Sequence, residues 1–300
     1  RDHVLGLEVV LATGEIVNLG GKVAKNSSGY SLLDLMIGSE GTLGIITKIM
    51  VKLLPLPKKV LTLLVPFPSL DLAIGAVPKI IRSRLMPQAI EFMERDVILS
   101  AEEFLGKKFP HKTAPAYLLL RFDGNNAAEL EAQYEAAGDV CLEVGAEDVL
   151  IADSSERQEG AWNARGAFLE ALKAESNMDE VDIVVPRNEI ANFIAYTKEL
   201  EMNHGVRIRS FGHAGDGNMH VYILQGDLEP EVWKEKLDIV MDLLYAKGRE
   251  LRGQVSGEHG IGIAKKQYLI EDLGSTLISL QKQIKQAFDP KQILNPGKLF

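Results

Sequence analysis

Cysteine is almost absent from this sequence, which has a single thiol, Cys141, in 300 residues. No disulfide within the chain is possible, so we expect a reducing compartment, the cytoplasm. No apolar run approaches the roughly 18 residues of a membrane-spanning helix, and no segment has the composition of a signal peptide. The net charge of −9 argues against a nucleic-acid backbone or an anionic membrane as the main partner, although a local basic pocket for a small acid remains compatible with it.

An initiator methionine is also missing, because the chain opens at Arg1 directly before a predicted strand. We therefore expect a piece of a longer protein. Its 300 residues suffice for one large domain or two moderate ones. Hydrophobic residues make up 46% and charged residues 25%, which is typical of a globular protein.

Histidine is scarce, and three of the six histidines fall in two glycine-rich segments. His213 and His220 flank a stretch rich in glycine, Asp and Asn, which is turn material. Alternating residues predict strands on either side, at 206–211 and 219–224. Such a hairpin would bring both imidazoles into one pocket, where Glu258 would complete a divalent-metal site. The alternative is that the histidines are only polar residues at strand ends.

Glu258 is followed by His259, which we interpret as a candidate base. On a strand the two side chains would point to opposite faces, whereas in a glycine-flanked turn they need not. Asp216 and Asn218 are further candidate ligands, but we favour a turn-capping role for both, because Asx residues between glycines often bond their own backbone.

Hydrophobic periodicity divides the chain at Pro55-Leu56-Pro57. Before this point it predicts a hairpin, a short helix and a further strand, at 4–11, 16–19, 31–36 and 45–53. After it, strands are predicted at 60–67, 88–93, 116–123, 146–152 and 181–185. Helices are predicted at 69–84, 96–105, 127–143, 187–203, 230–251 and 275–288, with one long helix from 154 through 172 and another opening at 257–262. This alternation predicts an α+β sandwich with helices on one face of the sheet.

The segment from Gly38 to Gly44 holds three glycines in seven residues. Such a loop lets the backbone approach a flat ligand closely, although a tight connection without any ligand explains the same pattern. No Gly-x-Gly-x-x-Gly dinucleotide fingerprint follows a predicted strand.

A metal-held hydroxyl beside a base fits two classes of reaction. One is the oxidation of an alcohol, which needs a hydride acceptor, and the other is hydrolysis by metal-bound water. Composition and spacing do not choose between them. A non-redox metal-binding fragment, either a hydrolase or a binding domain, is therefore the alternative function.

Four motifs in order along the chain, the first of them in two parts, together resemble a known family. Residues 26–30 and 38–47 look like the second half of the FAD-binding domain of vanillyl-alcohol-oxidase-type flavoproteins. Residues 213–220, 257–260 and 295–298 resemble one branch of that family, which holds the glycolate oxidase D subunit, D-lactate dehydrogenases and D-2-hydroxyglutarate dehydrogenase.

This resemblance implies oxidation of a D-2-hydroxy acid to a 2-oxo acid, with the hydride passing to flavin N5. It implies that His213, His220 and Glu258 bind a divalent metal (zinc, manganese or iron) and that His259 takes the hydroxyl proton. Trp162-x-x-Arg165 resembles the segment whose Arg pairs with the substrate carboxylate; a solvent-facing helix Arg is the alternative. The residues matching segments that line the flavin are Asn26, Gly29, Tyr30, Gly38, Ser39, Glu40, Gly41, Thr42, Gly44, Ile45 and Asn295.

The fold implied is α+β: the C-terminal part of a PCMH-type FAD-binding domain, followed by a ferredoxin-like α+β substrate (cap) domain with a helical C-terminal segment. The implied domains are 1–55, the second part of the FAD-binding domain; 56–287, the C-terminal substrate and metal domain; and 288–300, a tail returning to the flavin. The family's first FAD subdomain has no counterpart in these residues.

In the hydroxyglutarate enzymes a Lys and an Asn help to hold the distal carboxylate. The matching positions here are Glu180 and Tyr222, which favours a smaller acid such as lactate or glycolate. The family leaves several electron acceptors open: an electron-transferring flavoprotein, a quinone or a cytochrome. We also expect the chain to associate as a homo-oligomer, because a missing subdomain would expose apolar surface.

Overall fold

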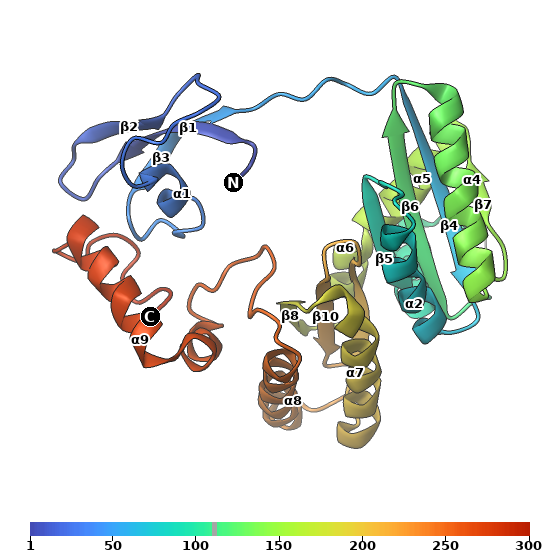
Figure 1. The fold of residues 1–300 in the computed structure, drawn as a ribbon. Helices are drawn as coiled ribbons and strands as arrows, with labels where there is room; N and C mark the ends of the chain where they lie inside the picture. Colours follow the sequence, from blue (N-terminus) through green and yellow to red (C-terminus); the bar gives the residue numbers. More distant parts are fainter. Residues whose placement is uncertain (110–112) are drawn as a thin grey trace. The chain divides into compact units, whose positions relative to one another are not determined.

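The computed structural model describes residues 1–109 and 113–300, so His111 lies outside the described residues. The chain forms two compact units (Figure 1). Unit 1 combines residues 1–56 with residues 258–300, and unit 2 consists of residues 57–257. The chain passes between the units at Leu56 and Pro57, in the proline-rich segment, and again at Gly257 and Glu258.

Unit 1 is built on a three-stranded antiparallel sheet in the order β2-β1-β3. Its elements are β1 (Val4–Val10), β2 (Ile16–Gly20), α1 (Leu32–Met36), β3 (Ile45–Val51) and α9 (Lys266–Phe288). Leu7, Val9 and Met36 are buried, and Ile284 and Phe288 of α9 pack against them. This apolar contact explains why the C-terminal helix belongs to the same unit as the N-terminal sheet.

Unit 2 is built on a seven-stranded sheet in the order β7-β4-β6-β5-β9-β10-β8. Its first elements are β4 (Lys59–Phe67), α2 (Leu70–Arg82), β5 (Ala89–Glu94), α3 (Arg95–Leu105), β6 (Ala116–Gly124), α4 (Ala127–Val144), β7 (Leu150–Ala152), α5 (Ser155–Gly166) and α6 (Phe168–Glu175). These are followed by β8 (Met178–Val184), a short 3₁₀ helix (Arg187–Glu189), α7 (Ile190–His204), β9 (Arg207–His213), β10 (Asn218–Leu224) and α8 (Pro230–Glu250).

The sheet has two halves that meet where β5 pairs with β9. The order β7-β4-β6-β5 is that of a ferredoxin-like unit, as predicted, and β8, β9 and β10 repeat its first three strands in the order β9-β10-β8. The junction is short: Glu91, Phe92 and Met93 face His213, Gly212 and Phe211.

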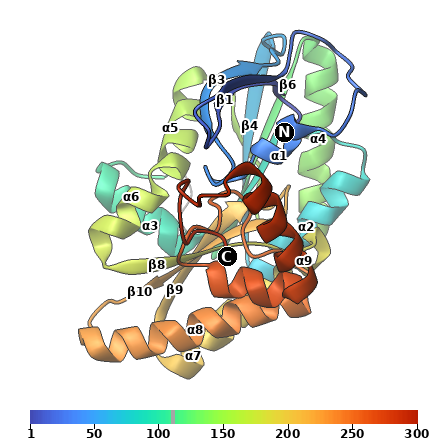
Figure 2. The ribbon, with the colours of Figure 1, turned by 90° about the vertical axis from the view of Figure 1, so that its left-hand side faces the viewer.

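Helices cover both faces of the sheet, so the prediction of helices on one face is wrong. Figure 2 shows α3, α5 and α6 on one side of β4 and β6, and α2 and α4 on the other. Residues 116–120 of β6 are all buried, so side chains pointing to either face are covered. A strand that is apolar on both faces needs a helix layer on each of them.

The face under α3, α5 and α6 carries both a hydrophobic core and the polar groups described below. Its buried residues include Leu119 and Phe211 on the strands and Phe168 on α6. The rings of Phe168 and Phe211 meet edge to face, with centroids 5.3 Å apart. Burial of one such aromatic side chain contributes about 1.5–3 kcal/mol to folding.

Two predicted boundaries in this layer are wrong. The single helix predicted from 154 through 172 is divided into two helices, α5 and α6, at Ala167, whose ψ of −7° departs from the α-helical value. Gly166 precedes this break, and glycine lowers helix propensity. The strand predicted at 146–152 pairs only over Leu150–Ala152.

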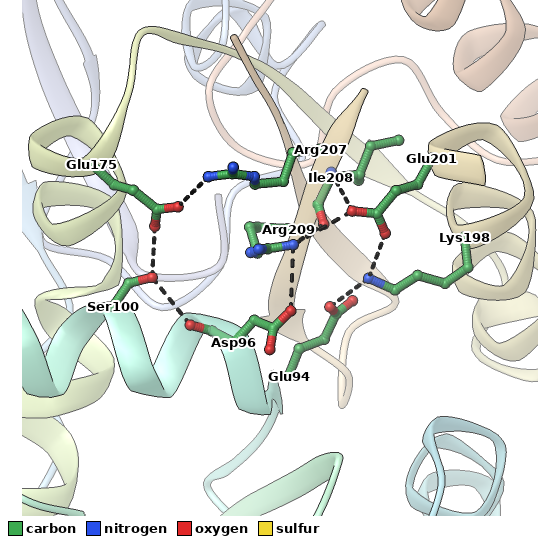
Figure 3. Close-up of polar contacts among 9 residues, drawn as sticks. All are labelled: Glu94, Asp96, Ser100, Glu175, Lys198, Glu201, Arg207, Ile208 and Arg209. Atoms are coloured by element: carbon green, nitrogen blue, oxygen red, sulfur yellow. Dashed lines mark hydrogen bonds and ion pairs between the residues drawn. The ribbon is translucent and has the colours of Figure 1, made fainter. Parts of the chain in front are cut away.

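A network of ion pairs ties β9 to the helices around it (Figure 3). Arg209 lies 3.4 Å from Asp96, at the start of α3, and 3.5 Å from Glu201 on α7. Arg207 pairs at 3.0 Å with Glu175 at the end of α6. The ion pairs anchor one end of the strand whose other end carries His213.

Lys198 on α7 extends the network to β5, where its ammonium group lies 2.7 Å from Glu94. Glu94 is only 3% exposed.

Within the described ranges, no helix is both long and apolar enough to cross a bilayer.

Candidate metal and substrate site

The β9–β10 hairpin brings His213 and His220 together, as the sequence predicts. Their ring centroids are 5.4 Å apart with nearly perpendicular planes, and one nitrogen from each ring lies within 4.8 Å of the other. The four-residue turn closes through a 3.0 Å bond from the Gly217 N–H to the His213 carbonyl oxygen. Gly217 has φ +84°, and a Cβ there would meet the Val185 carbonyl oxygen at 2.2 Å, so the turn requires glycine.

The turn-capping role predicted for Asn218 is wrong, whereas that of the Asp216 side chain stays a prediction. Among the described residues, the turn is closed by the backbone N–H groups of Asp216 and Gly217, both bonded to the His213 carbonyl oxygen. Asn218 is buried, and its Oδ1 has no hydrogen-bond partner within the described part of the chain.

Glu91 faces His213 from the neighbouring strand β5, and sequence reasoning missed it. The two residues are opposite each other in the ladder, and His213 Nδ1 lies 2.7 Å from Glu91 Oε1. Glu91 is 4% exposed. Burial acts to raise the pKa of this carboxyl, but the hydrogen bond from His213 and the charge of Arg165 outweigh it and hold the pKa below its usual range.

Arg165 on α5 binds the second oxygen of the same carboxylate. Its Nε and Nη2 lie 2.9 Å and 2.8 Å from Glu91 Oε2. The guanidinium carbon is 4.7 Å from the centroid of the Phe211 ring. The side chain is 14% exposed, so the solvent-facing alternative is wrong.

The face of α5 that holds Arg165 is fixed one turn earlier along the helix. Trp162 Nε1 donates a 3.0 Å hydrogen bond to Thr62 Oγ1 on β4, and Gln158 Nε2 donates one to the Val60 carbonyl oxygen. Residues 158, 162 and 165 share one helix face. This helix face therefore places the Arg165 side chain next to Glu91 on β5.

His220 faces carboxylates on β8 in a similar way. Its Nδ1 lies 3.3 Å from Glu180 and 3.8 Å from Asp182, its partner in the ladder. The Tyr222 hydroxyl donates a 2.8 Å hydrogen bond to Glu180. Burial, with the nearby Glu180 carboxylate, raises the pKa of Tyr222, so the phenol stays protonated.

Asp182 also fixes the segment that leads out of unit 2. Its Oδ2 accepts hydrogen bonds from Ser256 Oγ at 2.7 Å and from the Gly257 N–H at 3.0 Å. Gln254 forms a β-bridge with Val184 just before this point. The chain therefore leaves unit 2 beside the strand that pairs with β10.

Glu258 and His259 are the first residues of unit 1 in this part of the chain. They lie in an irregular segment, not a strand, so the opposite-face alternative does not apply. His259 Nε2 lies 4.0 Å from Glu258 Oε1, and the His259 side chain is 39% exposed.

Unit 1 holds the predicted flavin segment together with the C-terminal tail. Glu40 accepts hydrogen bonds from the backbone N–H groups of Ile261 and Gly262, at 2.7 Å and 2.8 Å. Asn295 Nδ2 donates a 2.8 Å hydrogen bond to the Glu40 carbonyl oxygen. A Cβ on Gly41 would meet Asn295 Nδ2 at 2.5 Å, and Gly41 has φ +69°, a backbone conformation that favours glycine.

The other predicted flavin residues occupy two settings. Asn26, Gly29 and Tyr30 lie in an exposed segment, where Tyr30 is 97% exposed. The remainder lie in or next to the glycine loop before β3; they are Gly38, Ser39, Thr42, Gly44 and Ile45. Ser39 and Thr42 are buried and joined by a 2.7 Å hydrogen bond, so they shape the loop.

The two imidazoles present the chemistry of a transition-metal site. His213 Nδ1 is hydrogen-bonded to the Glu91 carboxylate, an arrangement that orients Nε2 as the metal-binding atom and raises its basicity, and His220 Nδ1 lies 3.3 Å from Glu180. Neutral imidazoles with one carboxylate suit zinc, manganese or iron. The donor set in unit 2 thus fits a divalent ion, and Arg165 lies on the same sheet face to receive an anionic group.

Glu91 left one signal in the sequence. In β5 it occupies a position on the same face as Met93, which belongs to the buried core. A carboxylate on a core-facing strand position needs a partner. The partners, His213 and Arg165, lie 122 and 74 residues away along the chain, beyond what local patterning reveals.

Comparisons with known proteins agree along the chain. Residues 56–299 match the family described as FAD linked oxidases, C-terminal domain. The whole chain is 50% identical to a D-lactate dehydrogenase of Anaerostipes hadrus, spanning 64% of that protein. It is 39% identical to a D-lactate dehydrogenase of Archaeoglobus fulgidus and 38% identical to the glycolate oxidase subunit GlcD of Bacillus subtilis, spanning 65% and 63% of them.

Solved structures show the same fold at low identity. The chain matches 4-ethylphenol oxidase from Gulosibacter chungangensis with a TM-score of 0.75 and 20% identity, over 99% of this chain and 66% of that one. It matches p-cresol methylhydroxylase with a TM-score of 0.76 and 17% identity, over 99% and 65% of the respective chains.

Proposed function

Because the chain belongs to the FAD-linked oxidases, we propose that it is the substrate- and metal-binding part of a flavin-dependent D-2-hydroxy acid dehydrogenase. The observation that carries the proposal is the convergence of His213 and Arg165 on the buried carboxylate of Glu91, with His220 beside them. The pair of imidazoles suits a metal, and the guanidinium suits a carboxylate. A 2-hydroxy acid offers a hydroxyl to the first and a carboxylate to the second.

We assign the metal to His213, His220 and Glu258. Chain connectivity supports Glu258 as the third ligand, since Gly257 is bonded to Asp182, the ladder partner of His220. The next Cα lies about 3.8 Å further on. Three protein ligands leave coordination positions for a substrate, and a divalent ion held there would lower the pKa of a bound hydroxyl.

The residues of this chain then divide the work. Arg165 binds the substrate carboxylate through the guanidinium N–H groups that Glu91 does not use, and so orients C2. His259 takes the hydroxyl proton as the C2–O bond becomes a carbonyl. FAD, when bound, supplies the acceptor for the hydride that leaves C2, which balances the oxidation to the 2-oxo acid.

We assign the flavin to residues 1–55 and the tail at 288–300, with residues 56–287 as the substrate and metal domain. The flavin-lining residues are those named from the sequence, from Asn26 to Ile45 with Asn295. The fit is supported by exposed apolar residues on strand β3, where Ile45 and Ile49 are 55% and 60% exposed. A surface of this kind suits a flat ligand or further protein, which is also the basis for proposing a homo-oligomer.

The substrate that we favour is a small acid, lactate or glycolate. Glu180 lies 3.3 Å from His220 and adds negative charge beside the proposed metal site. A second substrate carboxylate would be repelled there. We propose a cytoplasmic enzyme that passes electrons to an electron-transferring flavoprotein or a quinone.

Anaerobic mixing of the full-length, FAD-bound protein with D-lactate tests the proposal. We expect the flavin absorbance to bleach with D-lactate and to stay unchanged with L-lactate. His259→Gln should retain the metal but slow bleaching by at least about 10²-fold, the usual contribution of a general base. If neither lactate nor glycolate bleaches the flavin of the metal-loaded protein, the dehydrogenase assignment is wrong.

Elemental analysis tests the metal assignment separately. About one equivalent of zinc, manganese or iron is expected in the parent, and His220→Ala should lose it. A parent that takes up no ion after supplementation would contradict the ligand assignment.

A further inference from the structure

We propose that Glu91 is a positioning residue that fixes the tautomer of His213 and the orientation of Arg165 at the same time. The inference rests on the proposed function, since it names how the metal ligand and the substrate-binding residue are held. Glu91 itself touches neither metal nor substrate in this assignment. It acts through the two side chains that do.

The two oxygens of Glu91 are used separately. Oε1 lies 2.7 Å from His213 Nδ1, and Oε2 lies 2.8–2.9 Å from two nitrogens of Arg165. Glu91 is 4% exposed, so water has little access to its carboxylate and cannot replace the hydrogen bonds from His213 and Arg165. Within the described residues, Glu91 is the only carboxylate that pairs with Arg165.

The position of Glu91 in the sheet lets one side chain link three elements. It lies at the junction of the two halves, where β5 and β9 pair over three residues only. His213 is its direct partner across the ladder, and Arg165 comes from the helix layer above. One side chain therefore links β5, β9 and α5 at the place where the proposed metal and substrate groups meet.

The chemical consequence is a fixed tautomer. An ionised carboxylate only accepts hydrogen bonds, so the Nδ1 of His213 must carry the proton that it donates to Glu91. Nε2 then holds the lone pair that binds a metal. Glutamine at position 91 would not fix this tautomer, because its amide has only one oxygen. It cannot accept hydrogen bonds from both Arg165 and His213 through separate oxygens.

Glu94 offers a matched control on the same strand. It is 3% exposed and bonded to Lys198 at 2.7 Å, so Glu94→Gln also removes a buried, ion-paired carboxylate from β5. Its partner lies on α7, away from the histidines. A general loss of sheet stability should appear in both variants, whereas loss of positioning should appear only in Glu91→Gln.

The first experiment is ¹⁵N NMR of histidine-labelled, metal-free protein, with the His213 signals assigned through His213→Gln. In the parent and in Glu94→Gln we expect the His213 ring with its proton on Nδ1. In Glu91→Gln we expect the proton to move to Nε2, since the new amide donates to Nδ1. An unchanged His213 tautomer in Glu91→Gln would overturn the proposal.

The second experiment titrates the same proteins with zinc and with manganese. Glu91→Gln should weaken binding about 10–100-fold, the range for loss of a partner behind a metal ligand. In the FAD-bound, full-length protein the same variant should raise KM for D-lactate, because Arg165 loses its anchor. A lower melting temperature with unchanged affinity and KM would mean that Glu91 is only structural.

These readouts separate the inference from the proposed function. If the parent binds neither metal, the proposed metal assignment fails. The tautomer of His213 in the metal-free protein still decides the role of Glu91.

Discussion

The Tyr222 hydroxyl donates a 2.8 Å hydrogen bond to Glu180, and the two residues are direct partners across β10 and β8. The same carboxylate lies 3.3 Å from His220. Tyr222 thus holds the negative charge of Glu180 next to the proposed metal ligand. We therefore expect Glu180 to influence which hydroxy acids the proposed enzyme accepts as substrates.

Glu180→Gln should widen the substrate range toward dicarboxylates. Removing the charge relieves repulsion of a second carboxylate, so kcat/KM for D-2-hydroxyglutarate relative to D-lactate should rise about tenfold, or ~1.4 kcal/mol. Tyr222→Phe is the matched control, since it keeps the charge and removes only the hydrogen bond. Steady-state kinetics with both acids measure the ratio, and an unchanged ratio in Glu180→Gln would refute this role.

Arg165→Lys should impair substrate binding more than folding. A lysine carries the charge but lacks the planar fork that pairs with Glu91 and a substrate carboxylate together. We expect KM for D-lactate to rise about 10–100-fold, which corresponds to a charged hydrogen bond of about 1.5–3 kcal/mol.

Arg157→Lys on the same helix is the control for Arg165→Lys. Arg157 is 70% exposed and pairs with Asp153, so its replacement should leave KM unchanged. Equal effects in the two variants would mean that the helix α5, not the guanidinium of Arg165, determines binding.

Glu94 should make stability depend on pH. Burial raises the pKa of this carboxyl above its ordinary value of 4.5, although Lys198 and Arg209 act in the opposite direction. The folded state therefore holds the proton more tightly than the unfolded state, and this contribution to stability is lost as pH rises from about 4.5 through the folded pKa. In urea unfolding, the parent should lose stability relative to Glu94→Gln over that window. Parallel pH profiles would contradict the prediction.

Lys198→Met should leave the Glu94 carboxylate buried without its closest cation. Removing one partner of a buried pair costs about 3–5 kcal/mol, and we expect the lower end because Lys198 is 31% exposed. Lys173→Met is the control: its pair with Glu170 is more than half exposed and should cost less than about 1 kcal/mol. Urea unfolding at neutral pH compares them.

The ionised Asp289 carboxylate should stabilise the folded state of unit 1 at neutral pH, and this stabilisation should be lost in acid. Burial acts to raise the pKa of its carboxyl, but bonds from Lys285 and from the Leu294 and Ile293 N–H groups hold the pKa below its usual value. The contribution to stability is therefore present above the unfolded pKa and lost as pH falls through the folded pKa. Asp289→Asn should remove this acid-sensitive part, whereas Asp2→Asn, at an exposed position, should not. Thermal melts from neutral to acid pH measure both variants.

Local patterns were sufficient for most elements and for part of the site. The alternation around the glycine turn predicted that His213 and His220 share a hairpin, and their rings are 5.4 Å apart. A hairpin is a local structure, so its two strands bring together residues close in sequence. The three-residue junction of β5 and β9 joins strands far apart in the sequence, and no local sequence pattern predicted it.

The sequence by itself determined most of the elements, the hairpin that pairs the two histidines and the family to which the chain belongs. Turn propensities and hydrophobic periodicity depend on a few neighbouring residues, so they can be recognised in a single sequence. Only the tertiary structure decided that helices cover both faces of the sheet and that Glu91 joins His213 to Arg165. Those outcomes depend on which strands become neighbours, and strand order is set by burial of whole faces, a property that no short segment contains.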